Sequence, residues 1–140
     1  MILNLNTETV GVVDKVYRNY HRGIYGLPFH YKEHDSYAGN LAQGENLFIS
    51  AQSVGSTIGF GHGNQNFSPE ELALWLTDCV LPWNYGGHIF ISANGSSRCY
   101  INQLLLELGS DFSNRIFGMF CSQGHHIEPP GYKGWITALI

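Results

Sequence analysis

The sequence NLFISAQSVGSTIGFGHGN, residues 46–64, decides the fold class of this protein. Residues 47–51 are apolar except for one serine, and such a run is typical of a strand that is buried on both faces, as in a parallel sheet. Gln52 and Ser53 end the run, and a loop with four glycines and His62 follows. A buried strand that leads into a glycine-rich loop is a common place for the chemistry of an α/β enzyme.

A helix is predicted after this loop. Ser68 is the expected N-cap, Pro69 the first helical residue, and Glu71 the partner that completes a capping box. Apolar side chains then recur three and four residues apart until Pro82 ends the helix. This stripe is typical of a helix with one face on a hydrophobic core.

A second unit of strand and helix follows. Residues 88–93 form another short apolar run, residues 94–96 predict a turn, and the next apolar stripe ends at Gly109. Further strands are expected at residues 115–120 and 135–140. Strands that alternate with helices predict an α/β fold, with a mostly parallel central sheet flanked by helices and joined by right-handed crossovers.

The first third of the chain has weaker patterns. Residues 10–17 predict a strand, and residues 24–31 an edge strand or a loop because Pro28 lacks a backbone N–H. Residues 31–44 are polar and indicate a surface loop. We find no repeat and no linker, so the length of 140 residues predicts a single domain over 1–140.

The composition argues against several classes of protein. Hydrophobic residues make up 44% of the chain and charged residues only 13%, which predicts a proper core rather than disorder. The formal net charge of −4, without a basic stripe, argues against nucleic-acid binding. No apolar run is long enough to predict a membrane span. Three cysteines and no evident signal peptide favour the cytoplasm, although export without a cleaved signal peptide stays open.

The expected carboxyl ends of the strands are polar. Ligands bind at these ends in parallel sheets, so the ends predict a binding cleft. The first two strands close with the same pattern, Phe-Ile-Ser-Ala followed by an amide residue. The residues that we expect to form this cleft are Gln52, Ser53, Asn94, Gly95, Ser96, Gln123 and His125.

Together, "LFISA", "SPEELALWL" and "IFISA" carry a family resemblance. Residues 46–109 resemble the caspase-like cysteine peptidase fold, and especially the self-processing cysteine protease domains of large bacterial toxins. The resemblance implies a three-layer sandwich, with a His-Gly pair after the first strand and a catalytic cysteine after the second. Here Gln52 and Ser53 occupy the first place, and Asn94 occupies the second.

These substitutions determine the function that the resemblance implies. A peptidase of this kind needs a thiolate and an imidazole at the two strand ends, and an amide side chain replaces neither. The resemblance therefore implies a domain without peptidase activity that acts by binding a protein partner or a small ligand. It also implies a setting in a bacterial virulence or competition system. The oligomeric state stays open.

The alternative is a cysteine hydrolase of the peptidase or deamidase type. His62 would be its base, and either Cys99 or Cys121 its nucleophile. Cys99 falls in the first turn of the second predicted helix, where a thiolate is stabilised. Cys121 ends a predicted strand, shortly before His125. Cys79 lies on the apolar stripe of the first helix and is expected in the core.

Two groups of potential metal ligands are too loosely spaced to predict a zinc site. They are His30, His34 and Asp35, and His125, His126 and Glu128. No phosphate-binding loop and no serine nucleophile elbow occurs in the sequence. We therefore expect neither a metal nor a cofactor.

Overall fold

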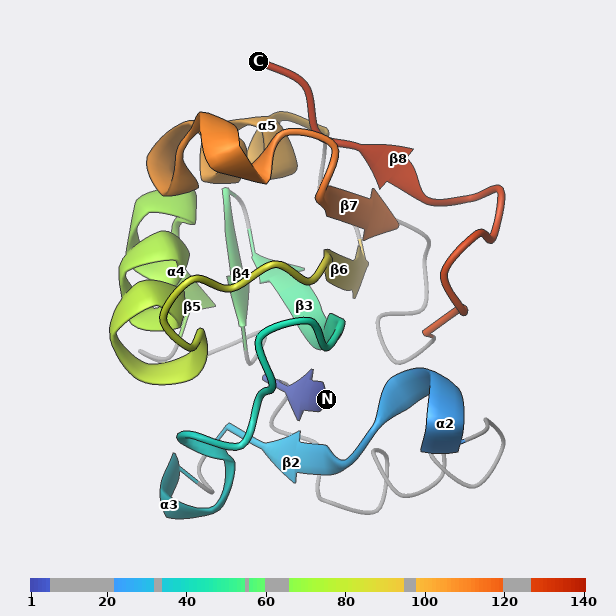
Figure 1. Cartoon of the computed structure of the whole chain (residues 1–140). Coiled ribbons are helices and arrows are strands. Elements are labelled where there is room, and N and C mark those ends of the chain that lie inside the picture. The colour runs from blue at the N-terminus through green and yellow to red at the C-terminus, as the bar shows by residue number, and fades with distance from the viewer. Residues whose placement is uncertain (6–21, 32–33, 55, 60–65, 95–97, 120–126) are drawn as a thin grey trace.

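The computed structural model describes residues 1–5, 22–31, 34–54, 56–59, 66–94, 98–119 and 127–140. It has an α/β fold built on one mostly parallel sheet (Figure 1). In spatial order, the main path of the sheet consists of β2 (Pro28–His30), β1 (Ile2–Asn4), β3 (Leu47–Val54), β6 (Ile89–Asn94), β7 (Ile116–Met119) and β8 (Ile136–Thr137). The first five of these strands run parallel, and β8 pairs antiparallel with β7.

Strand β3 continues beyond its parallel neighbours. Its last residues pair antiparallel with β4 (Thr57–Gly59), which pairs in turn with β5 (Asn66–Phe67). The parallel pairing with β6 ends at Gln52, so the strand extends further than the apolar run predicts.

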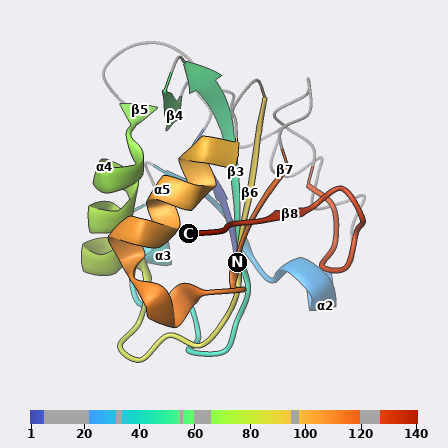
Figure 2. The ribbon, with the colours of Figure 1, turned by 90° about the horizontal axis from the view of Figure 1, so that it is seen from above.

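Helices lie on both faces of the sheet. Figure 2 shows α4 (Pro69–Trp75) and α5 (Arg98–Leu108) on one face and α2 (Arg22–Tyr25) on the other. Helix α3 (His34–Tyr37) lies beside β2, and α4 continues into a π-helical turn, Leu76–Val80. This layering is the α/β sandwich that the sequence predicts.

The start of α4 confirms the predicted capping box. The hydroxyl of Ser68 accepts a hydrogen bond from the backbone N–H of Glu71 at 3.1 Å. The Glu71 carboxylate accepts one from the backbone N–H of Ser68 at 2.9 Å, and this bond holds the pKa of Glu71 below its usual range. Both partners lie within three residues of each other, which is why the sequence alone predicts this cap.

Two hydrophobic clusters separate the layers. The larger one lies under α4 and α5 and includes Ile49, Ile91 and Leu104. The smaller one, which we call the aromatic layer, lies on the face of α2. It consists of Ile2, Tyr25, Phe48, Phe90 and Ile127, with Phe117 and Trp135 packed against it.

Three phenylalanines form the centre of the aromatic layer. Phe48, Phe90 and Phe117 are register partners on β3, β6 and β7. Their rings stack across the sheet, with centroids 4.9 and 5.0 Å apart and interplanar angles of 13° and 14°. The register of the strands therefore aligns these rings.

Some predictions from the sequence need correction. Residues 31–44 are not only a surface loop, because they contain α3 and the buried side chains of Tyr37 and Leu41. Residues 24–31 include the end of α2, although β2 is an edge strand as the proline suggested. The predicted strand at 10–17 lies outside the described residues, and the sequence did not predict strand β1.

Buried tyrosines make the fold sensitive to alkali. Burial raises the pKa of Tyr37 to about 12, and it raises the pKa of Tyr85 and Tyr100 further. An acid whose pKa is higher in the folded state than in the unfolded state stabilises the fold below the unfolded pKa, here about 10. This contribution is lost as the pH rises from about 10 through the folded values.

We therefore expect the free energy of unfolding in urea to be flat near pH 9 and to fall between about pH 10 and 12. Tyr100→Phe should make this fall shallower, although it also removes the hydrogen bond from Tyr100 to the carbonyl of Phe67. Tyr132→Phe is the control, since Tyr132 is exposed. Equal slopes for the Tyr100 and Tyr132 variants would contradict the expectation.

Candidate functional site

The structure places Gln52 and Asn94 side by side, near the carboxyl end of β3 and at the carboxyl end of β6. They are Cα partners and form the last register pair of the two parallel strands. Gln52 is half-buried. Ser53 continues into the antiparallel extension of β3, where it pairs with Ile58.

The other predicted residues of this cleft and two of the predicted catalytic residues lie outside the described residues. They are Gly95, Ser96, Gln123 and His125 of the cleft, and His62 and Cys121 of the alternative hydrolase site.

A row of buried polar side chains lies next to this pair. His30, Asn4, Ser50 and Ser92 are register partners on the neighbouring strands β2, β1, β3 and β6. Their exposed fractions are 9%, 0%, 4% and 0%, and apart from tyrosines they are the buried polar side chains of the described residues. We call them the polar row.

The polar row lies on the same face of the sheet as the aromatic layer. Side chains two residues apart on a strand share a face. Ser50 follows Phe48 by two residues, and Ser92 follows Phe90 by two. This face therefore changes from aromatic to polar toward the carboxyl ends of the strands, while the opposite face stays apolar at Ile49, Ala51 and their partners on β6.

The polar row crosses the point where the order of the strands reverses. From β1 the chain moves to β2 on one side, and from β3 it moves to β6 on the other. Open α/β sheets bind ligands outside the carboxyl ends of the strands at such a point. Asn4 and Ser50 are the register partners there. Buried polar groups are costly unless hydrogen-bonded, and each member of the row has an interaction partner.

The side chains of the polar row and of Gln52 are of types that form hydrogen bonds. Hydroxyl and amide groups both donate and accept hydrogen bonds, but they do not ionise near neutral pH. Gln52, which is half-buried, can therefore contact a polar ligand, whereas the side chains of the polar row are buried and already have partners.

The two cysteines in the described part of the chain have different surroundings. Cys79 is half-buried against the larger cluster, which agrees with the expected place in the core. Cys99 is exposed in the first turn of α5. The structure therefore leaves Cys99 accessible to a reagent or a substrate.

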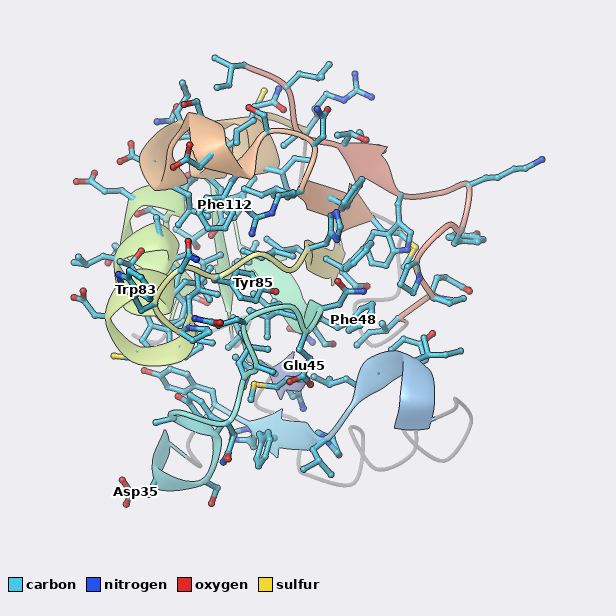
Figure 3. All side chains as sticks on the ribbon, in the orientation of Figure 1. Asp35, Glu45, Phe48, Trp83, Tyr85 and Phe112 are labelled. Carbon is cyan, nitrogen blue, oxygen red and sulfur yellow. The ribbon has the colours of Figure 1, made fainter. Side chains whose placement is uncertain are left out.

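The first group of potential metal ligands does not gather in one place. His30 is buried in the polar row, whereas Asp35 is exposed on α3 and points away from the sheet in Figure 3. Within the described ranges, no three His, Cys, Asp or Glu side chains are grouped so that they could hold a metal ion. His125 and His126 of the second group lie outside those ranges.

Sequence analysis missed the polar row. His30 was considered only as a metal ligand, and the serines of "LFISA" and "IFISA" only as parts of apolar strands. The repeated serine was the available signal, since two equal positions on parallel strands become neighbours if the strands pair in register.

Comparison of the chain with protein-family models, with curated proteins and with solved structures gives no match. In the part of the chain that the structure describes, no helix has the length and apolar character needed to cross a membrane.

Proposed function

We propose that this protein is a caspase-like domain without peptidase activity, and that it acts by binding a protein partner or a small ligand at the carboxyl edge of its sheet. The observation that carries the proposal is the register pairing of Gln52 with Asn94. The resemblance assigns a catalytic histidine and a catalytic cysteine to these two positions. Their adjacency is the geometry that such a pair would need.

The amides support binding rather than catalysis. An amide side chain has no accessible pKa, so it cannot take the proton of a nucleophile, and it is not itself a nucleophile. It offers both a donor and an acceptor, which suits a peptide group or another polar ligand. The setting implied by the resemblance is a bacterial virulence or competition system.

The proposal is tested by introducing a histidine at position 52 and a cysteine at position 94, the two residues that the resemblance assigns to these positions. In the double variant Gln52→His with Asn94→Cys, the new imidazole and thiol lie on neighbouring strands. The backbones of such strands are about 4.8 Å apart. We expect the imidazole to lower the pKa of the introduced thiol by about one unit or more relative to Asn94→Cys alone. The measurement is the rate of alkylation by iodoacetamide against pH, with each cysteine followed separately by mass spectrometry.

The matched control is Gln52→Leu with Asn94→Cys, which fills the same position without a base. Its introduced thiol should titrate like that of the single variant. If Gln52→His leaves the pH profile of alkylation unchanged, the two positions do not face each other, and the proposal loses its support.

The cysteine hydrolase remains the second candidate because Cys99 is exposed at the start of a helix. Its test uses the unmodified protein and a thiol-reactive probe at neutral pH. Rapid labelling of Cys99 or Cys121 that is abolished by His62→Ala would favour the hydrolase and overturn the binding proposal. Slow labelling that is insensitive to His62→Ala would exclude a His62-activated thiol.

A further inference from the structure

A cavity of about 430 Å³ lies at the opposite end of the sheet from the Gln52–Asn94 pair. Asn46 and His88, which line it, come immediately before β3 and β6, at the amino ends of these strands. The cavity is also lined by Phe90, Phe117, Tyr132 and Trp135. Its volume is that of a small-molecule site.

The walls of the cavity are aromatic rings held by their neighbours. Phe90 stacks on Phe117, and the ring of Trp135 meets Phe90 edge-on, with centroids 5.1 Å apart. The indole N–H of Trp135 donates to the carbonyl of Pro129 at 2.9 Å. The imidazole of His88 packs at 5.9 Å from the ring of Phe117. The walls are therefore fixed before any ligand arrives.

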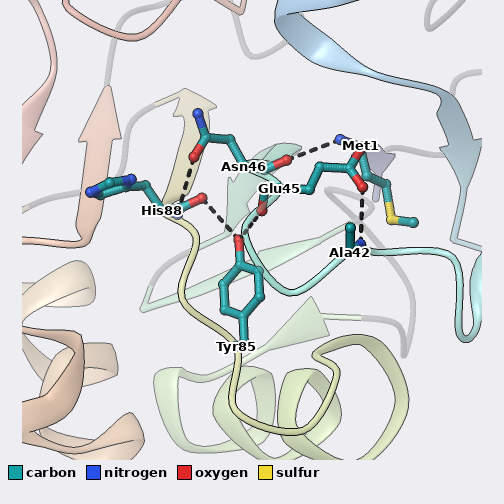
Figure 4. A network of polar contacts seen from close by, with 6 residues as sticks. All are labelled: Met1, Ala42, Glu45, Asn46, Tyr85 and His88. Atoms are coloured by element: carbon teal, nitrogen blue, oxygen red, sulfur yellow. Dashed lines mark hydrogen bonds and ion pairs between the residues drawn. The ribbon is translucent and has the colours of Figure 1, made fainter.

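A hydrogen-bond network positions the two polar residues of the cavity (Figure 4). The hydroxyl of Tyr85 donates to the carbonyls of Glu45 and His88, at 2.6 and 3.2 Å. The backbone N–H of His88 donates to Oδ1 of Asn46 at 3.2 Å. Asn46 is held further because its carbonyl accepts a hydrogen bond from the amino group of Met1 at 2.9 Å.

This network leaves two hydrogen-bond donors available, the amide N–H groups of Asn46 and the imidazole N–H of His88. Oδ1 of Asn46 is occupied by His88, and Figure 4 shows the amide nitrogen pointing away from the network. In the described part of the chain, the hydrogen bonds of His88 are made by its backbone, so its imidazole is available. An imidazole has one N–H donor when neutral and two when protonated. The described residues that line the cavity include no Asp or Glu.

We infer that this cavity binds a small aromatic carboxylic acid. The ring of the ligand lies against Phe117 and Trp135, and its carboxylate accepts hydrogen bonds from Nδ2 of Asn46 and from the imidazole of His88. Aromatic walls with a few placed polar groups are typical of ligand sites, and hydrogen bonds to a charged group are stronger than neutral ones. This site is separate from the carboxyl edge, so the inference does not depend on the proposed function.

The probe is 2-naphthoate, titrated into the ¹⁵N-labelled protein at pH 7. The indole N–H signal of Trp135 should shift and saturate, with a Kd on the order of 1 mM or below. The indole signal of Trp83 is the internal reference, because Trp83 is exposed and lines a different cavity. Methyl 2-naphthoate and 2-naphthylmethylamine keep the rings but lack the carboxylate. They should bind at least about tenfold more weakly.

Two variants test the donors separately. Asn46→Asp keeps an oxygen for the N–H of His88 but replaces the amide donors with negative charge, and we expect about tenfold weaker binding or more. His88→Phe keeps a ring on the wall and removes the imidazole donor, with a loss of similar size. Trp83→Phe is the control and should leave the affinity unchanged, and circular dichroism verifies the fold of each variant.

Three results would overturn the inference. They are the absence of a saturable shift at Trp135, equal binding of the acid, the ester and the amine, and unchanged affinity in folded Asn46→Asp and His88→Phe. None of these results bears on the Gln52–Asn94 pair, so failure here and failure of the proposed function are distinguishable.

Discussion

Gly87→Ala is expected to lower the free energy of unfolding by about 3 kcal/mol. Gly87 is buried between two chain segments, and a Cβ added there would overlap the carbonyl oxygen of Glu45. It would also lie 2.5 Å from the hydroxyl of Tyr85. These two groups are hydrogen-bonded to each other at 2.6 Å, so neither moves without loss of that bond. Arg115 further fixes this segment, because its Nε donates to the carbonyl of Gly87 at 2.9 Å.

The neighbouring glycine provides the control for this prediction. A Cβ at Gly86 would meet the carbonyl oxygen of Gln43 at 3.7 Å, which is ordinary contact. We expect Gly86→Ala to be neutral or to stabilise the protein by up to about 1 kcal/mol, since alanine restricts the unfolded chain. Urea unfolding followed by circular dichroism measures both variants. Similar urea midpoints for Gly86→Ala and Gly87→Ala would show that the carbonyl of Glu45 and the hydroxyl of Tyr85 can move away from an added methyl group at position 87.

The elements that sequence analysis predicted well carry local signals. The capping box of α4 needs only Ser68 and Glu71, three residues apart, and the structure contains both of its hydrogen bonds. Strands β3 and β6 were visible as continuous apolar runs because both of their faces are covered. Strand β1 has only three residues, which is too short for any period to appear. Helix α3 was missed because one turn with a single buried ring, Tyr37, has no stripe.

The sequence does not predict in the same way which strands pair with each other. A strand shows its own alternation of side chains, but it does not show which strand lies beside it. The polar row exists because Asn4 pairs with Ser50 and Ser50 with Ser92, across segments that are distant in sequence. The cavity likewise depends on a contact between Asn46 and His88, which are 42 residues apart. By contrast, the sequence itself relates Gln52 to Asn94, because both follow the same Phe-Ile-Ser-Ala run.

Phe48→Ala is expected to have the largest effect on stability, about 4 kcal/mol. The side chain of Phe48 is fully buried at the centre of the aromatic layer. Its ring stacks on Phe90 and meets Tyr25 edge-on, with both centroids 4.9 Å away. Truncation removes both contacts and leaves a void in the smaller of the two clusters, where few other side chains are available to fill it.

Phe48→Leu separates the effect of losing buried volume from the effect of losing the aromatic ring. Leucine keeps most of the apolar bulk, so we expect a cost of about 1 to 1.5 kcal/mol in urea unfolding. Leu74→Ala controls for truncation at an exposed site, and its effect should be within about 0.5 kcal/mol. Equal costs for the alanine and leucine variants of Phe48 would show that the loss of buried volume does not set the effect.

The same substitution links the aromatic layer to the cavity. Phe90 stacks on Phe48 on one side and lines the cavity on the other. If Phe48 holds that wall in place, Phe48→Ala should weaken the binding of 2-naphthoate although Phe48 does not line the cavity. Phe48→Leu should weaken it less. An unchanged affinity in folded Phe48→Ala would show instead that Trp135 and Phe117 fix the ring of Phe90 without support from the centre of the layer.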